Sequence, residues 1–289
     1  MKTNMYKNSV KQWCPFVGCG YACSYCRSSF QDQLKRWAKS NCPQCYEFEP
    51  HSHENRLNQR MPHTSFMQFI FVCASSDISF CPTEHLAKIV DRMRDEPNKT
   101  FLLQSKNPKT FDRVQFSKNV ILGTTLETNI DDIYEGISKA PRPSKRYKDF
   151  VNVAHPAKMV TVEPVLDFDI NVMVSWIENI QPCMVWLGYD SRKNHLPEPP
   201  LEKVKSFYWE LGTLGFRVML KTIREAWWEQ AGSPTPERAD RVRQGVLRNS
   251  IKDRRCFAEI AGPNRRTGNC GRSPIILRDL PEKINLKKN

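Results

Sequence analysis

Three cysteines near the start of the chain have a spacing that can hold an iron–sulfur cluster. Cys19, Cys23 and Cys26 are arranged C-x3-C-x2-C within the stretch CPFVGCGYACSYCRSSF at 14–30, which also contains Cys14. Three thiolates at this spacing can bind three irons of a cubane and leave the fourth iron open for an exogenous ligand. Alternatively, the same thiols could staple a small fold through disulfides or hold a structural zinc ion.

Cellular location bears on the choice between disulfides and metal. The chain has 11 cysteines in 289 residues, and its N-terminal stretch MKTNMYKNSV lacks the apolar core of a secretory signal peptide. No apolar run approaches the ~20 residues of a membrane span. We therefore expect a cytoplasmic protein that does not insert into membranes. In a compartment that keeps thiols reduced, metal or cluster ligation explains the cysteines better than disulfides do.

A second group of candidate ligands follows the first. Cys42 and Cys45 form CPQC, and His51 and His53 stand close behind. Two thiolates and two imidazoles make a tetrahedral zinc set, which would fix the long loop after the first three cysteines. One alternative is a second iron–sulfur cluster that borrows Cys14. Another is that the two histidines serve the main fold as hydrogen-bonding residues on opposite sides of a strand.

The other five cysteines have no comparable spacing. Cys73 and Cys183 lie in apolar runs, so we expect both in the core. Cys256 and Cys270 stand fourteen residues apart in a basic, loop-rich region and could be ligands, although their spacing gives no support. Cys81 has no predicted role.

Beyond the cysteines, apolar runs of strand length alternate with stretches of helical periodicity. Besides a strand at the cysteine segment, we expect strands at 65–74, 100–106, 119–127, 158–166, 183–190 and 216–223, and helices at 82–96, 108–116, 129–140, 169–180 and 199–215. This alternation is typical of a parallel sheet covered by helices. No Gly-x-Gly-x-x-Gly follows a strand, so a dinucleotide-binding fold has no support.

Each expected strand ends in polar residues. They are Ser75, Ser76 and Asp77; Gln104, Ser105 and Lys106; Thr124, Thr125 and Glu127; Glu163; Asp190; and Lys221. The site residues of a barrel stand at the carboxyl ends of its strands. The pattern therefore favours an α/β fold, a partial (β/α) barrel of about six parallel strands with its site on that face. The simpler explanation is that strand ends are polar because loops are exposed.

The cysteine spacing at the start of such a chain resembles the radical S-adenosylmethionine superfamily. The stretches FEPHSHENRL (48–57), FLLQSKNPKTF (101–111), NVILGTTLETN (119–129) and VTVEPVL (160–166) resemble a phage- and prophage-associated branch of it, largely of unknown function. The resemblance covers residues 13 to about 225. One departure is Cys14, which stands where the branch usually has Asn; it is either an extra ligand or, more simply, a buried free thiol.

The resemblance implies a cofactor and a reaction. Cys19, Cys23 and Cys26 would hold a [4Fe–4S] cluster whose fourth iron binds S-adenosylmethionine. An electron from a cellular donor would cleave that cofactor to a 5′-deoxyadenosyl radical, which abstracts hydrogen from a substrate.

The resemblance also implies cofactor-binding residues. Tyr25 would lie near the adenine, and the turn of Ser75, Ser76 and Asp77 would hold the amino group. Thr125, Glu127 and Asn129 would face the ribose, with Glu163 toward ribose or substrate. Lys106, Asp190 and Lys221 share this rim and would face substrate, unless they form ordinary exposed salt bridges.

The net charge of +13 is unevenly distributed. Residues 231–289 contain fourteen Lys or Arg and six Asp or Glu, a balance of +8, which leaves +5 for the rest of the chain. The Gly-Ser-Pro-Thr-Pro stretch at 232–236 is a linker signal. We therefore expect residues 1–230 to form the barrel, with a Cys/His-rich insertion at 40–57, and residues 231–289 to form a basic C-terminal extension.

A basic extension is the electrostatic footprint of a nucleic-acid binder, or else a solvated tail. RWAK (36–39), RPSKRYK (142–148) and Trp227–Trp228 add side chains suited to phosphate contacts and base stacking. The sequence thus predicts a radical enzyme that modifies or repairs nucleic acid or a nucleotide, related in logic to spore photoproduct lyase; a ribosomally made peptide is another candidate substrate. The alternatives are a non-catalytic, zinc-dependent nucleic-acid-binding protein and an iron–sulfur sensor.

Overall fold

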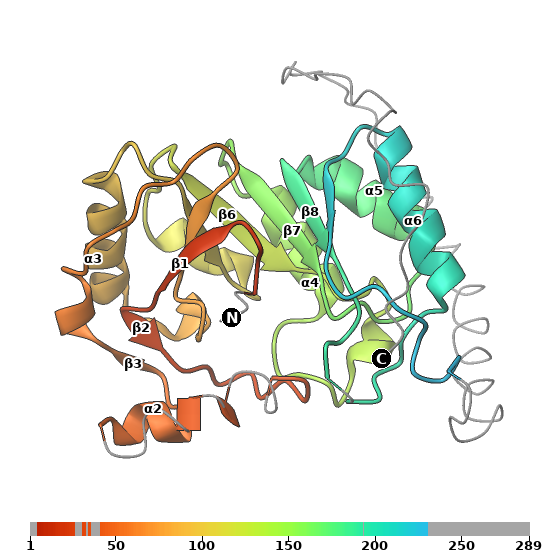
Figure 1. The fold of residues 1–289 in the computed structure, drawn as a ribbon, viewed down its shortest axis with the longest axis horizontal. Coiled ribbons are helices and arrows are strands. Elements are labelled where there is room, and N and C mark those ends of the chain that lie inside the picture. Colours follow the sequence, from red (N-terminus) through yellow and green to blue (C-terminus); the bar gives the residue numbers. More distant parts are fainter. Residues whose placement is uncertain (1–4, 27–30, 33, 36–40, 193, 231–289) are drawn as a thin grey trace.

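The computed structural model describes residues 5–26, 31–32, 34–35, 41–192 and 194–230. Within them, seven strands form one curved, fully parallel sheet in the order β1-β4-β5-β6-β7-β8-β9, a half-barrel (Figure 1). The predicted α/β partial barrel is therefore confirmed, with one strand more than six. The strands are β1 (Ser9–Trp13), β4 (Phe69–Val72), β5 (Phe101–Gln104), β6 (Val120–Thr125), β7 (Lys158–Val162), β8 (Met184–Leu187) and β9 (Val218–Leu220).

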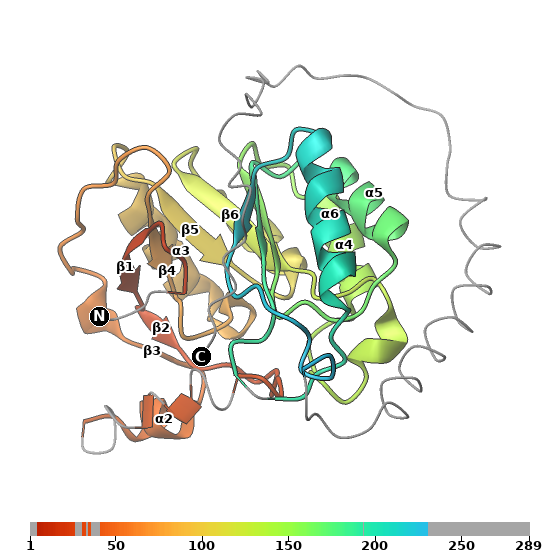
Figure 2. The ribbon, with the colours of Figure 1, turned by 45° about the vertical axis from the view of Figure 1, so that its right-hand side comes forward.

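Helices cover the outer face of the sheet. They are α3 (Thr83–Arg94), α4 (Pro143–Val151), α5 (Ile170–Ile180) and α6 (Leu201–Thr213), and α4, α5 and α6 pack side by side (Figure 2). Short 3-10 helices complete the connections: η3 (Ile78–Phe80), η4 (Pro108–Arg113) and η5 (Asp131–Tyr134). The main core lies between these helices and the sheet, because each helix buries one apolar stripe.

One expected helix was placed wrongly. The stretch 129–140 forms only η5, and the helix of this crossover is α4, which covers residues that looked like a basic patch. The physical reasons are local. Gly136 has φ +75°, which ends any helix there, and Pro143 fits the first turn of α4 because its missing N–H would be unsatisfied anyway.

A small subdomain carries the second cysteine pair. Strands β2 (Phe16–Val17) and β3 (His51–Ser52) form an antiparallel pair, with α2 (Pro43–Glu47) before β3 and the 3-10 helix η2 (Glu54–Arg56) after it. Figures 1 and 2 both show β2, β3 and α2 below the main sheet. We call this unit, residues 16–17 and 41–56, the Cys/His subdomain.

The predicted boundary near residue 230 stays a prediction, because the basic extension at 231–289 lies outside the described residues. The last described strand is β9, and residues 221–230 continue beyond it along the barrel. No helix in the described part of the chain has the length and apolar character needed to cross a membrane.

Tyr6 fills the concave face of the half-barrel. It is completely buried and packs against the rings of Phe69, Phe71 and Trp186, with ring centroids 5.8, 5.2 and 4.9 Å away. Its hydroxyl donates a hydrogen bond to Gln104 Oε1 at 2.7 Å and lies 3.0 Å from the Thr161 hydroxyl. The segment before β1 thus supplies the floor beneath the open end of the barrel.

We predict that Tyr6→Ala lowers the free energy of unfolding by about 3–5 kcal/mol, because it empties a closed aromatic cluster. Phe66→Ala is the control, since that ring is 86% exposed and its loss should change the value by no more than about 0.5 kcal/mol. Urea unfolding followed by circular dichroism measures both. Equal losses in the two variants would contradict the assigned role of Tyr6.

Candidate functional site

A cavity of about 830 Å³, partly continuous with solvent, lies at the carboxyl ends of the strands. All three cysteines of the C-x3-C-x2-C motif line it. So do residues that follow four neighbouring strands: Ser75, Ser76 and Asp77 after β4; Gln104, Ser105 and Lys106 at the end of β5; Thr125 at the end of β6; and Glu163 after β7. Parallel strands bring their carboxyl ends to one edge, which is why residues so far apart in sequence meet here.

The cysteine loop is held by close backbone contacts. Gly18 has φ +94°, and a Cβ atom there would lie 2.1 Å from the Glu49 carbonyl oxygen, so only glycine fits. Its N–H donates to the carbonyl of Ser75 at 3.0 Å. The next residue, Cys19, donates its N–H to the carbonyl of Phe48 at 3.4 Å. The loop is thereby clamped between the turn after β4 and the Cys/His subdomain.

The three thiols differ in their surroundings. Cys23 Sγ lies 3.0 Å from the Ser138 hydroxyl and 3.3 Å from Lys106 Nζ. A hydrogen bond from Cys26 and the charge of Lys106 lower the pKa of Cys23 to about 5 despite burial. Burial raises the pKa of Cys19 to about 12, and the nearby Asp77 carboxylate adds to this. Of these two thiols, Cys23 therefore ionises more readily to the thiolate, the form that binds iron.

The donor set fits a cluster better than a single ion. In the described part of the chain, the ligand atoms gathered within 4.8 Å of one another belong to a different group, Cys42, Cys45, His51 and His53. A cubane presents its irons at separate corners, so its thiolates need not surround one point. Three thiols from one loop that all line one open cavity suit a cluster with one open position.

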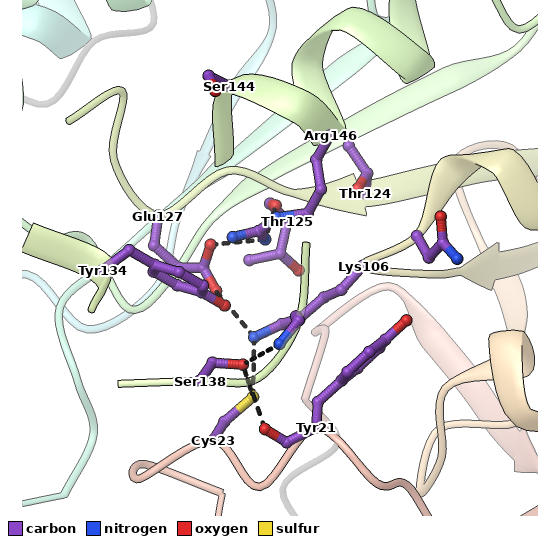
Figure 3. Close-up of polar contacts among 12 residues, drawn as sticks. Tyr21, Cys23, Lys106, Thr124, Thr125, Glu127, Tyr134, Ser138, Ser144 and Arg146 are labelled. Atoms are coloured by element: carbon purple, nitrogen blue, oxygen red, sulfur yellow. Dashed lines mark hydrogen bonds and ion pairs between the residues drawn. The ribbon is translucent and has the colours of Figure 1, made fainter. Parts of the chain in front are cut away.

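Beside the cysteines lies a buried charge cluster built on Glu127 (Figure 3). The Glu127 carboxylate is fully buried and lies 2.7 Å from Arg146 Nη1 and 2.8 Å from Lys106 Nζ. The hydroxyl of Tyr25 donates to it at 2.5 Å and also contacts Lys106. Burial alone would raise the pKa of Glu127, but the charges of Arg146 and Lys106 outweigh it and lower the pKa to about 2.

Two of the predicted cofactor-binding residues do not line the cavity. Glu127 does not line the cavity, because its oxygens are occupied by its own cations rather than free for a ribose. Asn129 also lies off the cavity: its amide group exchanges hydrogen bonds of 2.8 and 2.9 Å with the backbone of Asp169. The other predicted cofactor-binding residues all line the cavity: Tyr25, Ser75, Ser76, Asp77, Thr125 and Glu163.

Some of these residues are already engaged by the fold. The Asp77 carboxylate accepts hydrogen bonds from the Ser105 hydroxyl at 2.6 Å and the Lys106 N–H at 2.7 Å. The Ser76 hydroxyl donates to the carbonyl of Cys73 at 3.0 Å. The turn after β4 is thus rigid and presents fixed carbonyl and hydroxyl groups to the cavity.

Of the three rim residues expected to face substrate, Lys106 lines the cavity and Lys221 reaches it through Glu163, with which it forms an ion pair. Burial raises the pKa of Glu163 and lowers that of Lys221, which brings the two groups closer in proton affinity. Asp190 instead folds its own loop by accepting hydrogen bonds from the backbones of Arg192 and Asn194, each 3.1 Å.

Sequence reasoning missed Arg146 as part of this region. RPSKRYK was interpreted as a surface for nucleic acid, yet Arg146 is fully buried. A usable signal was present: Pro143, Arg146 and Phe150 follow helical spacing and form the buried side of α4. An arginine inside such a stripe requires a buried partner, which is Glu127.

The tryptophan pair serves the fold in a way the sequence did not indicate. The indole N–H of Trp227 donates to the carbonyl of Leu196 at 2.7 Å, and that of Trp228 to the carbonyl of Glu198 at 2.9 Å. Both tie the chain after β9 to the loop after β8. The RWAK stretch at 36–39 lies outside the described residues.

The remaining cysteines divide as follows. Cys73 is buried, as expected, but the prediction for Cys183 was wrong: it is exposed, because it precedes β8 rather than lying within it. Cys14 is half-buried, and burial raises its pKa, which agrees with a protonated thiol. Cys256 and Cys270 lie outside the described residues.

The second ligand group is brought together as its spacing suggested. The ligand atoms of Cys42, Cys45, His51 and His53 all lie within 4.8 Å of one another. The alternative that placed the histidines on opposite sides of a strand was wrong. Residues i and i+2 share one face of a strand, and the two imidazole centroids are 4.5 Å apart.

Residues 6–189 match the family described as "Protein of unknown function (DUF5131)". The chain belongs to this family. The match contains every strand from β1 to β8, the cysteine loop and the Cys/His subdomain, so these features lie within the family region. No curated protein matches the chain in sequence.

A solved structure, the crystal structure of Streptococcus suis SuiB bound to S-adenosylmethionine, is similar with a TM-score of 0.46 and 9% sequence identity. The alignment covers 73% of this chain and 49% of that chain. This DUF5131 protein therefore spans about half the length of SuiB.

We predict that Glu127→Gln lowers the free energy of unfolding at pH 7 by about 3–5 kcal/mol, because it leaves two buried cations without their anion. The folded pKa of about 2 lies below the ordinary 4.5, so ionised Glu127 stabilises the native state fully above pH 4.5. This stabilisation is lost as the pH falls toward 2. The difference between wild type and variant should therefore shrink over that window.

Urea unfolding at a series of pH values from 7 to 3 measures this difference. Glu135→Gln is the control, since Glu135 is exposed. If the difference in the free energy of unfolding between wild type and Glu127→Gln stays constant down to the lowest pH, an ionised Glu127 is not the source of that difference.

Proposed function

We propose that this protein is a radical S-adenosylmethionine enzyme. One observation carries the proposal: Cys19, Cys23 and Cys26 line the same cavity as the polar ends of four parallel strands. A structural metal site closes its ligands around the ion, whereas these thiols line a cavity that is partly open to solvent. An open site at the carboxyl end of a barrel is where catalysis is expected.

The three cysteines would hold a [4Fe–4S] cluster. When S-adenosylmethionine binds its fourth iron, such a cluster supplies the electron that cleaves the cofactor to a 5′-deoxyadenosyl radical. A cellular electron donor is part of this proposal. The turn at Ser75–Asp77 would receive the amino group of the cofactor, because its carbonyls and hydroxyl are fixed beside Cys19. Tyr25 and Thr125 would line the adenosyl part.

Other residues of the chain would shape the environment of that chemistry. Lys106 places a positive charge 3.3 Å from Cys23 Sγ, which favours the thiolate and with it a bound cluster. Tyr6 and its aromatic neighbours close the cavity from the barrel side and exclude water, which a reactive radical requires. Glu163 lines the cavity and pairs with Lys221, so its carboxylate would accept a hydrogen bond from a hydroxyl of ribose or substrate.

The decisive experiment is anaerobic reconstitution with iron and sulfide, reduction with dithionite and addition of S-adenosylmethionine. We predict formation of 5′-deoxyadenosine, measured by mass spectrometry. The Cys19→Ala/Cys23→Ala/Cys26→Ala variant should lose both iron and product. Cys183→Ala should retain both, because that exposed cysteine lies outside the cavity. A colourless wild type that releases no 5′-deoxyadenosine would refute the proposal.

For the substrate, we propose nucleic acid or a nucleotide, in a modification or repair reaction. The support is electrostatic. The chain carries +13, of which +8 falls on residues 231–289, and a basic surface draws phosphates to the protein at long range. The rival function, a non-catalytic zinc-dependent nucleic-acid-binding protein, shares this charge and is favoured by the Cys/His subdomain.

We predict that the full chain binds fluorescein-labelled single-stranded RNA or DNA, with a dissociation constant that rises steeply with salt. Each phosphate contact adds about 0.7 to the slope of log K against log salt for single strands. Fluorescence anisotropy measures this, with polyglutamate of similar charge as competitor. If polyglutamate displaces the labelled strand as well as unlabelled nucleic acid does, the support for a nucleic-acid substrate is removed. Binding without 5′-deoxyadenosine formation would favour the rival function.

A further inference from the structure

We infer that Cys42, Cys45, His51 and His53 bind one zinc ion, and that this ion holds in place the cavity wall that positions Cys19. The site lies in the Cys/His subdomain, apart from the cysteine loop that lines the cavity. Zinc binding at this site does not depend on the proposed function. Only the consequence of holding Cys19 in place, as a ligand of the cluster, rests on the proposed function.

The four ligand atoms surround one centre. The Nε2 atom of His51 lies 3.4 Å from Cys42 Sγ and 3.3 Å from Cys45 Sγ, and His53 Nε2 lies 3.2 Å from Cys45 Sγ. The two Nε2 atoms are 2.8 Å apart. A tetrahedral zinc with ordinary bond lengths sets sulfur and nitrogen about 3.5 Å apart and two nitrogens about 3.3 Å apart. The observed distances are somewhat shorter, so small outward shifts of the four ligands would admit the ion.

Hydrogen bonds around the site orient the ligands for a metal. His51 Nδ1 lies 2.7 Å from the Glu49 carbonyl oxygen, so in the neutral ring Nδ1 carries the proton and Nε2 presents its lone pair to the thiols. Metal-bound histidines commonly donate their other N–H in this way. The backbone N–H of Cys45 donates to Cys42 Sγ at 3.3 Å, an arrangement that stabilises a thiolate.

The geometry favours a single ion over a second iron–sulfur cluster on these residues. In a two-iron cluster with two cysteines and two histidines, the two residue types bind different irons and stand on opposite sides. Here Cys45 and His53 approach within 3.2 Å. Cys14, the candidate extra ligand, hydrogen-bonds with Ser75 and Ala74 in the turn after β4, and it is not among the gathered ligand atoms.

The subdomain needs such a staple because it has almost no core of its own. Among the described residues, its apolar cluster contains only two buried residues, Val17 and Cys45. Four partly buried residues pack against them: Cys14, Leu34, Cys42 and Tyr46. So little buried area does not repay the entropy of ordering residues 41–56. Four bonds to one ion would supply that stabilisation.

The metal site is joined directly to the cavity wall. His51 pairs with Val17 across the β2–β3 ladder, two residues before Cys19, and the His53 N–H donates to the carbonyl of Pro15 at 2.7 Å. Phe48, between Cys45 and His51, lines the cavity and accepts the hydrogen bond from Cys19 N–H. An ion that fixes Cys45 and His51 therefore fixes Phe48, which accepts the hydrogen bond from the Cys19 N–H, and Val17, two residues before Cys19.

The test begins with metal content. We expect about one zinc per chain in anaerobically purified wild type, measured by elemental mass spectrometry together with iron. Cys45→Ala and His53→Ala should lower zinc affinity more than about 100-fold, since a lost ligand costs at least as much as a lost supporting contact. Cys183→Ala and His63→Ala, at exposed positions, are matched controls that should keep zinc. Cobalt added to zinc-free wild type should give the visible spectrum of a tetrahedral thiolate site.

A second measurement covers variants that fail to fold. Wild type is stripped of zinc with a chelator and compared with the zinc-loaded protein by hydrogen–deuterium exchange. We expect faster exchange, by at least tenfold, at 15–19 and 45–53 without zinc, and no change in β5, β6 and β7. Unchanged exchange at 15–19 would overturn the positioning role, and wild type without zinc or a tetrahedral cobalt spectrum would overturn the site.

The outcomes separate this inference from the proposed function. Zinc binding with no 5′-deoxyadenosine leaves the metal site standing and removes the radical enzyme. Formation of 5′-deoxyadenosine by wild type that binds neither zinc nor cobalt removes the metal site and leaves the radical enzyme standing.

Discussion

The burial of an ionised carboxylate at the end of β6 constrains everything around the cavity. Glu127 is fully enclosed, and an unpaired charge there would cost far more than the fold can supply. Its partners come from three different elements: Lys106 after β5, Arg146 on α4 and Tyr25 in the cysteine loop. Each must be in place for the others to be tolerated, so one carboxylate fixes two strand ends, a helix and the loop together.

The cysteine loop depends on this arrangement because it has little regular structure. A helix or strand would hold its thiols through a repeating backbone ladder, but residues 18–26 lie outside the named elements. They are held by contacts with other segments: Gly18 against the turn after β4, Cys19 against Phe48, and Tyr25 against Glu127. Loops held in this way can keep polar groups pointed into a cavity, since no ladder has to be satisfied.

The sequence predicted the parts of this molecule that follow from local pattern. The strand at 100–106 and the helix at 169–180 are visible in the spacing of their apolar residues, so the partial barrel could be predicted. The Cys-x2-Cys and His-x-His spacings likewise indicated which ligands meet.

What could not be predicted depends on long-range partners. Arg146 belongs to a basic run whose composition suggests a surface, and nothing local shows that Glu127, nineteen residues earlier, needs a cation. Glu127 itself was assigned to a ribose because its position at a strand end was visible and its burial was not. Tyr6 lies in a polar stretch, MYKNSV, and becomes a core residue only once the sheet curves around it.

The two cysteine groups illustrate how similar ligands can serve opposite purposes. Cys42, Cys45, His51 and His53 converge on one point, use both ring nitrogens of His51, and are surrounded by almost no hydrophobic core. Cys19, Cys23 and Cys26 open onto a cavity beside side chains that the fold holds in place: Tyr6 and Asp77 by hydrogen bonds, and Glu127 by its ion pairs. Ligands that converge on one ion stabilise a segment that has little hydrophobic core. Ligands that leave a coordination position open need surroundings that are already held in place by the rest of the fold. In the functions proposed above, one group completes the architecture of the chain and the other does chemistry on it.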